Sequence, residues 1–256
     1  MKKYYILLFA ISFNVFSPLN LQAKKVRTLR LTSYNIQHGK GLDGKIDHNR
    51  LASILHEART EVAAIQEVDS VTKRNGGVYA LDEIGSKLKM YSTFAPAIDF
   101  QGGKYGVGIL SKKAPLSVHR VALHGKEEPR VLLVAEFEHY VVGCTHLSLN
   151  EDDRLSSIPL IVEEAQKWKK PFFLLGDLND TPESSFYREM QKHFLFLNPS
   201  YDKTFPADAP DVCIDHVAIF KPTVTTESML SFYRTWVGEE TFSDHRPLHA
   251  KIGIFR

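Results

Sequence analysis

The sequence predicts an α/β fold in which two packed, mixed β-sheets are covered by helices. From about residue 26 onward, apolar strand-like runs alternate with segments of helical periodicity, an order that places helices over buried sheets. Several strand-like runs also follow one another directly between residues 105 and 147, which indicates hairpins and excludes a purely parallel sheet. With 43% hydrophobic and 24% charged residues in a chain of 256, one large folded domain is expected and disorder is not.

The first 23 residues have the order of parts of a secretory signal peptide. Lys2 and Lys3 form a short positive region, residues 4–16 are almost wholly apolar, and Ala23 provides a small residue just before Lys24. An uncleaved anchor is the alternative, but the apolar run is shorter than the roughly 20 residues that span a membrane. We therefore expect residues 1–23 to be removed and residues 24–256 to form a single exported domain, periplasmic or secreted, with no transmembrane span.

Removal of this segment leaves a chain without net charge. The sequence holds 32 basic and 30 acidic residues, and Lys2 and Lys3 lie in the removed part, so 30 of each remain. Proteins that bind nucleic acid without sequence preference usually carry a basic excess, because phosphate neutralisation drives that binding. No strong nucleic-acid signature is therefore present, and we expect a monomer. The only cysteines, Cys144 and Cys213, are expected to be buried and unlinked.

The elements follow from apolar patterning in chain order. Strand-like runs lie at residues 26–34, 62–68, 105–110, 131–137, 140–147, 172–175 and 248–255. Asp47 is a plausible N-cap for a helix with Leu51, Ile54 and Leu55 on one face. Further helices are expected at residues 81–88 and at 152–168, where Pro159 either kinks the helix or resets its start.

Polar residues suited to metal and phosphate chemistry recur where the apolar strands end. They are Ser33-Tyr34-Asn35, Gln66-Glu67, Thr145-His146, Gly176-Asp177-Leu178-Asn179, Ile214-Asp215-His216 and Ser243-Asp244-His245-Arg246-Pro247. Strands lying side by side would gather these residues along one rim of the sheets. Carboxylates hold hard cations, and imidazoles donate to phosphate, so the mixture indicates a divalent cation acting on a phosphoryl group.

These motifs, in this order, resemble those of the endonuclease/exonuclease/phosphatase superfamily, the group that includes DNase I. Tyr105-Gly106-Val107-Gly108 resembles its central strand, and Thr204-Phe205-Pro206 the segment before its fifth motif. The resemblance covers nearly all of residues 26–256 and is strongest toward compact bacterial metal-dependent hydrolases, which are similar in turn to the hydrolase-like domain of proteins that remodel GPI lipids. It implies a four-layer sandwich, α/β (α+β) in class, with the metal at the rim where the sheets meet.

The resemblance also implies the metal ligands. Glu67 would be the principal ligand, with Asn35 beside it, and Asp244 would complete the metal and water network. The cation would be Mg²⁺, or Mn²⁺ or Ca²⁺ in its place.

Five further residues receive catalytic roles from the resemblance. Asp177 would orient or deprotonate the attacking water, and Asn179 would hold that water or the phosphate. His245, polarised by Asp215, would stabilise charge on the phosphoryl oxygens or protonate the leaving group. His146 would act similarly from the opposite side.

Each of these residues has a simpler explanation when taken alone, as a turn residue, a helix cap or a satisfied core histidine. Taken jointly, the simple explanations require six coincidences in one order. Four other histidines, His38, His48, His216 and His249, are expected to be structural. His216 stands where the family commonly has an aromatic residue.

The substrate is less specified than the chemistry. Arg154 and Tyr105 are the candidate substrate contacts, although Ser157 and Val107 replace a glutamine and an asparagine common in the family. A phospholipid or sphingolipid headgroup, or a small soluble phosphoester, is the favoured substrate, either as phosphodiester or phosphomonoester. Two alternatives remain: a secreted DNase I-like endonuclease and a catalytically silent binding domain.

Overall fold

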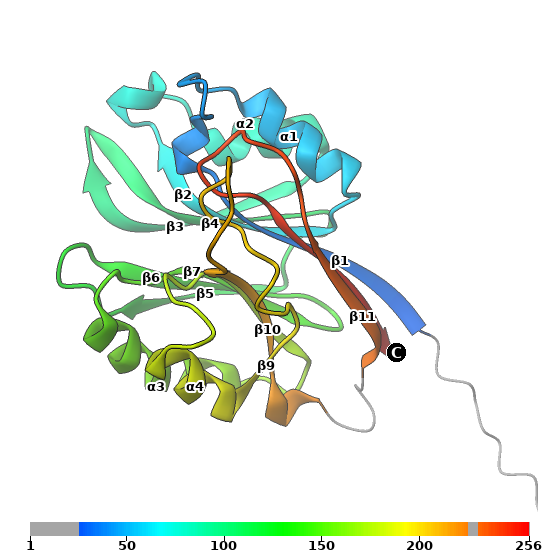
Figure 1. The fold of residues 1–256 in the computed structure, drawn as a ribbon. Coiled ribbons are helices and arrows are strands. Elements are labelled where there is room, and N and C mark those ends of the chain that lie inside the picture. The colour runs from blue at the N-terminus through cyan, green and yellow to red at the C-terminus, as the bar shows by residue number, and fades with distance from the viewer. Residues whose placement is uncertain (1–25, 225–229, 256) are drawn as a thin grey trace, which may run out of the picture.

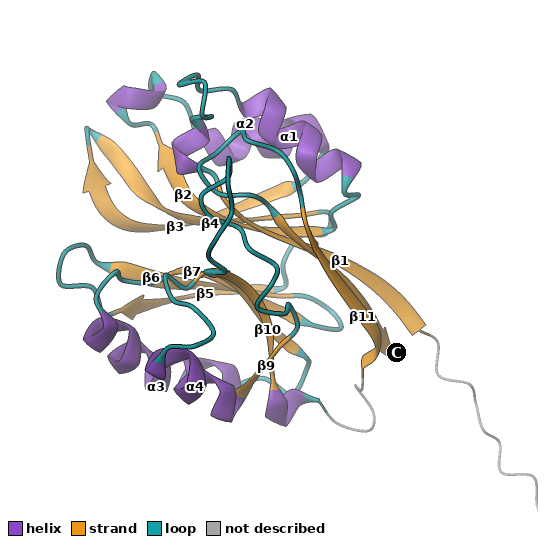
Figure 2. Cartoon of the chain, viewed as in Figure 1, coloured by secondary structure: helices purple, strands orange, loops and turns teal. Residues whose placement is uncertain are grey.

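The computed structural model describes residues 26–224 and 230–255, so the predicted signal peptide at residues 1–23 lies outside the described residues. Figure 2 shows helices on the two outer faces and strands between them. The described residues contain four α-helices: α1 (His48–Glu57), α2 (Ala80–Leu88), α3 (Glu151–Gln166) and α4 (Ser185–His193). The strands are β1 (Val26–Asn35), β2 (Val62–Ser70), β3 (Tyr91–Phe100), β4 (Gly103–Ser111), β5 (Ser117–Leu123), β6 (Arg130–Glu136), β7 (Val141–His146), β8 (Phe172–Asp177), β9 (Phe194–Phe196), β10 (Asp215–Phe220), β11 (Leu230–Val237) and β12 (Leu248–Phe255).

The strands form two six-stranded mixed sheets that pack face to face. The first has the order β11-β12-β1-β2-β4-β3 and the second β5-β6-β7-β8-β10-β9. Each contains one parallel pair, β1 with β2 and β7 with β8, and the other pairs are antiparallel. α1 connects the first parallel pair and α3 the second, as parallel neighbours require. α1 and α2 cover the outer face of the first sheet, and α3 and α4 that of the second (Figure 1). The predicted two-sheet, four-layer sandwich is confirmed.

Three apolar clusters fill the spaces between the four layers. The central cluster joins the facing sides of the two sheets and includes Leu31, Leu133 and Ile252. A second cluster lies between α3, α4 and their sheet, and a third between α1, α2 and theirs. Each sheet is therefore apolar on both faces, which explains why its inner strands read as continuous apolar runs.

Most predicted elements are present. Asp47 is the N-cap of α1, its carboxylate accepting a hydrogen bond from the backbone N–H of Asn49. The last strand runs over the predicted residues 248–255. α3 continues through Pro159 and begins at Glu151, with Asn150 as its N-cap, so Pro159 does not reset its start. Strands β3, β5, β9, β10 and β11 and helix α4 are additions to the predicted set.

Two motif segments occupy the opposite strand ends from those expected. Asp215 is the first residue of β10, and residues 243–247 precede β12, whereas both were expected to follow strands. β10 pairs antiparallel with β8 and β12 antiparallel with β1. An antiparallel strand begins where its neighbour ends, so these segments still reach the rim at which β1 and β8 end.

Both cysteines have buried, unpaired thiols, as predicted. Cys144 contacts the Gln66 amide, Sγ to Nε2 3.4 Å, and Cys213 contacts the Asn198 amide, Sγ to Nδ2 3.5 Å. Burial raises the pKa of each thiol to about 12, which keeps both protonated and unreactive. Within residues 26–224 and 230–255, no helix has the length and apolarity needed to cross a membrane.

Candidate active site

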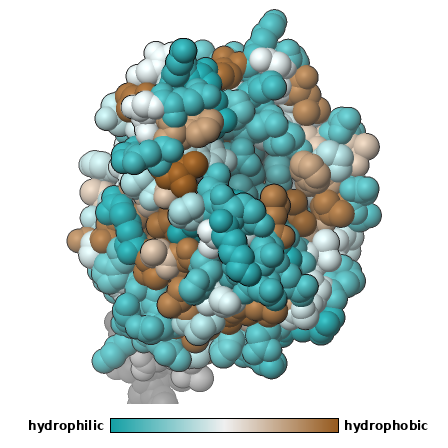
Figure 3. All heavy atoms as spheres, turned by 90° about the vertical axis from the view of Figure 1, so that its left-hand side faces the viewer, coloured by the Kyte–Doolittle hydropathy of each residue, from teal (hydrophilic) through white to brown (hydrophobic). Residues whose placement is uncertain are grey.

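The predicted site residues converge at one end of the sandwich. Asn35, His146 and Asp177 are the last residues of β1, β7 and β8. β1 runs from the lower right of Figure 1 toward the left, so this rim lies at the left end of the molecule. Figure 3 looks onto that end, where hydrophilic side chains cover most of the surface and apolar ones form small scattered groups. The site is therefore a polar rim at one end of the apolar cluster that joins the two sheets.

A β-bulge presents Glu67 to this rim. Between the pairs Ile65–Gly108 and Val68–Gly106, β2 advances three positions and β4 only two, so β2 carries one extra residue. Glu67 has a φ of 57°, in the left-handed region. Gln37, His38 and Asn179 also have positive φ, at 44°, 48° and 52°. Four of the eight described non-glycine residues with positive φ thus belong to the motif segments, and such conformations cost about 1–3 kcal/mol each.

Asn35 links the two sheets at the centre of the rim. Its Nδ2 donates to Glu67 Oε1 at 3.1 Å and to Asp177 Oδ2 at 3.0 Å. Its Oδ1 accepts from the backbone N–H of Gln37 at 3.1 Å, which fixes the amide orientation. One neutral side chain thus holds two carboxylates, from different sheets, close together.

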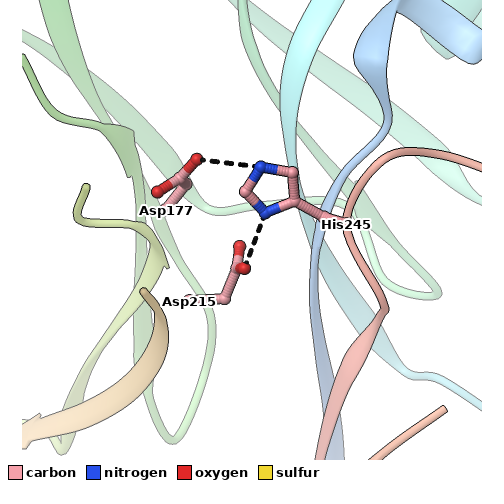
Figure 4. Close-up of side chains that lie close together, drawn as sticks. All are labelled: Asp177, Asp215 and His245. Carbon is pink, nitrogen blue, oxygen red and sulfur yellow. Dashed lines mark hydrogen bonds and ion pairs between the residues drawn. The ribbon is translucent and has the colours of Figure 1, made fainter. Parts of the chain in front are cut away.

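His245 lies between two buried carboxylates (Figure 4). Its Nδ1 is 2.8 Å from Asp215 Oδ2, and its Nε2 is 3.6 Å from Asp177 Oδ2. Burial disfavours the imidazolium, but the charges of Asp215, Asp177 and Asp244 outweigh it and raise the pKa of His245 to about 10. At neutral pH the ring is therefore protonated, donates from Nδ1 to Asp215 and forms an ion pair with Asp177.

Thr204 and Phe205 contact the Asp215–His245 pair and help to position it. The hydroxyl of Thr204 donates to Asp215 Oδ2 at 2.5 Å, the same oxygen that His245 contacts. The ring of Phe205 lies against that of His245, with centroids 4.8 Å apart. Both residues belong to the Thr204-Phe205-Pro206 segment, to which the sequence analysis assigned no catalytic role. The available signal was a hydroxyl and an aromatic residue that precede the motifs of Asp215 and His245 in the chain.

The pKa of His146 is shifted in the opposite direction from that of His245. Its Nε2 is 3.5 Å from Asp177 Oδ2. Burial lowers the pKa of His146 to about 4, assisted by the positive charges of Arg130 and His245 and opposed by Asp177. His146 is therefore neutral at pH 7 and can donate one hydrogen bond without adding charge.

Asp177 and Asn179 are positioned by the turn that follows β8. The backbone N–H of Asn179 donates to Asp177 Oδ1 at 2.9 Å, and the Asn179 amide donates to the carbonyl of Leu147 at 2.8 Å. Gly176 lets β8 reach this point, because a Cβ there would lie 2.1 Å from the carbonyl oxygen of Thr145. Gly176 and Asp177 thus end a strand, and the simpler turn-pair explanation does not apply.

Asp244 completes the rim on the side of the first sheet. Gln37 Nε2 donates to Asp244 Oδ2 at 2.9 Å, and Ser243 Oγ lies 3.2 Å from Asp244 Oδ1 and donates to the Asn35 carbonyl at 2.7 Å. Gln37 and Ser243 lay inside recognised motifs and had no assigned role. Both act by holding residues that were assigned one.

The carboxylates of Glu67, Asp244 and Asp177 form a donor set suited to a hard cation. Burial raises the pKa of Glu67; the charges of Asp244 and Asp177 raise it further, and the Asn35 hydrogen bond opposes this. Clustered anions of this kind are relieved by a divalent cation, and carboxylate and amide oxygens are its preferred ligands. The residues present therefore fit a divalent metal.

A different trio, Asp177, Asp215 and His245, has its ligand atoms all within 4.8 Å of one another. This trio is a poor cation site, because His245 Nδ1 already contacts Asp215 and the ring is protonated. It fits a charged hydrogen-bonding pair, Asp215 and His245, next to a second carboxylate, Asp177. A divalent cation would therefore fit better on the Glu67 side of the rim.

The two candidate substrate contacts, Tyr105 and Arg154, differ in their surroundings. Tyr105 lines a small hollow beside His146, at the rim. Arg154 is buried on α3, where its guanidinium lies 2.9 Å from Asp180 Oδ2 and donates to the Ser148 carbonyl at 2.9 Å. Arg154 is thus held by Asp180 and Ser148, and a substrate role for it stays a prediction.

Three of the four histidines expected to be structural have protein partners of their own, while His38 has positive φ in the segment after β1 and its structural role stays a prediction. His216 packs against Tyr187 and Phe196, with ring centroids 5.2 Å apart in each case. His48 Nδ1 lies 2.6 Å from Glu83, and His249 stacks on Trp236. His216 thus fills the aromatic position at which it departs from the family pattern.

Comparison with known proteins agrees with this geometry. Residues 32–245 match the Endonuclease/Exonuclease/phosphatase family, and the chain belongs to it. No match was found among curated protein sequences.

Solved structures share the fold at low sequence identity. An endonuclease/exonuclease/phosphatase from Bacteroides vulgatus has a TM-score of 0.72 at 16% identity, covering 89% of this chain and 99% of that one. A mannosyl-6-phosphatase from Bacteroides thetaiotaomicron has a TM-score of 0.66 at 16% identity, covering 88% and 99%. The human Nocturnin catalytic domain, solved with a sulfate anion, has a TM-score of 0.65 at 14% identity, covering 89% and 94%. The chain is thus a member of a family of phosphoester hydrolases with the two-sheet fold.

Proposed function

We propose that this chain is a divalent-metal-dependent phosphoesterase. The observation that carries the proposal is the placement of a protonated His245 between Asp215 and Asp177, 2.8 Å and 3.6 Å away, with Asn35 linking Asp177 to Glu67. A fixed positive charge beside clustered carboxylates is what stabilisation of a phosphoryl transition state requires. A binding domain has no use for this arrangement of charges.

Glu67 and Asp244 would hold the cation, with Asn35 positioning Glu67. When bound, the cation supplies positive charge to the phosphoryl oxygens. Mg²⁺ is the favoured ion, with Mn²⁺ or Ca²⁺ as substitutes.

The side chains of this chain perform the remaining steps. Asp177, held by Asn35 and the Asn179 backbone, accepts the proton of a water whose oxygen attacks phosphorus. The new P–O bond forms as the bond to the leaving oxygen breaks, and the leaving oxygen takes a proton from solvent. His245 stays protonated and stabilises charge on the phosphoryl oxygens, and neutral His146 donates a hydrogen bond from the other side.

We propose a small phosphoester or a lipid headgroup as substrate, acted on by an exported monomer. Residues 24–256 carry 30 basic and 30 acidic residues, so no basic excess favours nucleic acid. The mannosyl-6-phosphatase of the same fold acts, by its name, on a mannosyl 6-phosphate group. Export rests on the signal-like residues 1–23, and an intact mass of exported protein that includes Met1–Ala23 would contradict it.

Hydrolysis of a substrate panel tests the proposal. Bis(p-nitrophenyl) phosphate, p-nitrophenyl phosphate, sphingomyelin, phosphoinositides, sugar phosphates and supercoiled plasmid are incubated with Mg²⁺ and with chelator. We expect turnover of a small or headgroup phosphoester that chelator abolishes and Asp177→Asn removes, while the exposed control Asp152→Asn retains it. Chelator-resistant turnover, or full activity of Asp177→Asn, would contradict the mechanism. Preferential plasmid nicking would favour the nuclease alternative.

A further inference from the structure

A small hollow lies between the two sheets beside His146. Its volume is about 10 Å³, and Tyr105, Glu128, Arg130 and His146 are among its lining residues. That volume is about the space that one water-sized atom needs. The hollow therefore has room for a single oxygen atom, at the edge of the proposed catalytic rim.

Arg130 contributes an unpartnered donor to this region. It is the first residue of β6, and its side chain is 9% exposed. Nη1 lies 3.2 Å from Glu128 Oε1, whereas Nε is buried and has no hydrogen-bond partner among the described residues. A buried donor left without a partner costs about 1–3 kcal/mol, so native structures rarely keep one without a purpose.

The charge of Arg130 acts on both other polar groups of the hollow. It lowers the pKa of His146, adding to the larger effect of burial. It also opposes the rise that burial and the charge of Glu67 produce in the pKa of Tyr105, whose phenol stays protonated. Arg130, His146 and Tyr105 line the same hollow, and all three groups are hydrogen-bond donors at neutral pH.

We propose that Arg130 is a substrate-binding residue whose Nε donates to one non-bridging oxygen of the phosphoryl group, seated in the hollow beside His146 and Tyr105. The inference rests on the proposed phosphoesterase function and adds hydrogen-bond donors to a rim that carries the carboxylates of Glu67 and Asp177. Guanidinium groups suit phosphate oxygens because they stay charged and are weakly hydrated. Glu128 holds the guanidinium in place, so little side-chain entropy is lost when phosphate binds.

Binding of inorganic phosphate tests the site directly. Dissociation constants are measured by isothermal titration with saturating Mg²⁺ for the wild type, Arg130→Gln, Arg130→Lys and the control Arg188→Gln, which removes an exposed charge on α4. We expect Arg130→Gln to weaken phosphate binding about tenfold or more, since a hydrogen bond to a charged group is lost. Arg130→Lys keeps the charge but lacks Nε, so it should also bind more weakly. Arg188→Gln should match the wild type.

The outcomes separate this site from the proposed function. Wild-type affinity in Arg130→Gln, or no phosphate binding by the wild type, would overturn the site. If Arg130→Gln does not fold by circular dichroism, wild-type affinity in Arg130→Lys overturns it equally. Arg130-dependent phosphate binding in a protein that hydrolyses no phosphoester of the panel would support the site and contradict the proposed function.

Discussion

Asn35 and Asp177 are 142 positions apart in the chain and end strands of different sheets, yet Asn35 Nδ2 donates to Asp177 Oδ2 at 3.0 Å. The same amide also reaches Glu67 at 3.1 Å. This side chain therefore sets the spacing of the two sheets at the rim and the spacing of the two carboxylates.

Replacing Asn35 by alanine should destabilise the metal-free protein. Glu67 and Asp177 would each lose a buried donor, and we expect the free energy of unfolding to fall by about 2 kcal/mol. Urea unfolding monitored by circular dichroism measures this. Asn49→Ala, at an exposed position of α1, should change it by less than about 0.5 kcal/mol. Equal stabilities for the two variants would show that the cross-sheet amide contributes nothing.

Glu67→Gln should nearly abolish turnover and yet stabilise the metal-free protein. A neutral amide cannot replace the charge that holds a divalent cation. The same change removes a buried negative charge near Asp244 and Asp177, so the metal-free melting temperature should rise. Turnover with saturating Mg²⁺ measures the loss of activity, Mg²⁺ titration the loss of cation binding, and thermal melting the gain in stability of the metal-free protein. Glu57→Gln on the exposed side of α1 is the matched control, and a Glu67→Gln variant with wild-type turnover would refute the ligand assignment.

His245 and Asp215 should behave as one functional unit. His245→Ala should lose about 2.7–4 kcal/mol of transition-state stabilisation, by analogy with loss of one oxyanion donor. Asp215→Asn removes the partner that charges the ring, so it should weaken the same function. The double mutant should then be little worse than His245→Ala alone, which kcat/KM values in a double-mutant cycle will show. Additive losses would mean that the two residues act separately.

His216 should make the protein sensitive to acid through stability and not through catalysis. Burial lowers the pKa of His216 to about 4, below its ordinary value near 6.5. The unfolded chain therefore takes up the proton first, and stability is lost as pH falls from about 6.5 toward 4. Between pH 7 and pH 5 the loss should be on the order of 2 kcal/mol.

The comparison variant is His216→Phe, which keeps an aromatic ring between Tyr187 and Phe196. Its melting temperature should fall less than that of the wild type over the same pH interval. Because His249 and His146 remain in both proteins, the difference isolates His216. Identical pH profiles for the two proteins would show that His216 does not titrate in this range.

The sequence predicted most of the elements whose apolar pattern is continuous and buried, but it missed the buried strand β10, whose first two residues are the polar Asp215 and His216. β12, with its predicted bounds confirmed, is buried against neighbours on both edges. β3 was missed because it is an edge strand that is largely exposed and contains Pro96, which a strand pattern does not favour. β5 was missed for the same reason: it is an edge strand of the second sheet and is only partly buried. Edge strands owe their position to a neighbour's hydrogen bonds, which the local pattern does not record.

The candidate site shows a related limit. Motif residues such as Asp177 and Glu67 were identified by type and order, and the structure brings them together at one rim. Asp215 was expected after a strand and stands before one, because the pairing direction of β10 is a tertiary property. Arg130 was given no role, since a single arginine at the start of an apolar run has no distinguishing pattern. Its interest comes from the missing partner of Nε, which only the packed structure reveals.

The strand order also sets when the first sheet can be completed during synthesis. The first sheet has β12, the last strand to be made, inserted between β11 and β1, and residues 117–220 build the whole second sheet in between. A nascent chain that ends before residue 243 therefore leaves one edge of β1 unpaired and lacks the His245 segment that contacts Asn35 and Asp215. Because pairing of strands far apart in sequence is slow, completion of the first sheet is expected to be a late folding step. A chain truncated before residue 243 would consequently lack part of the proposed catalytic rim.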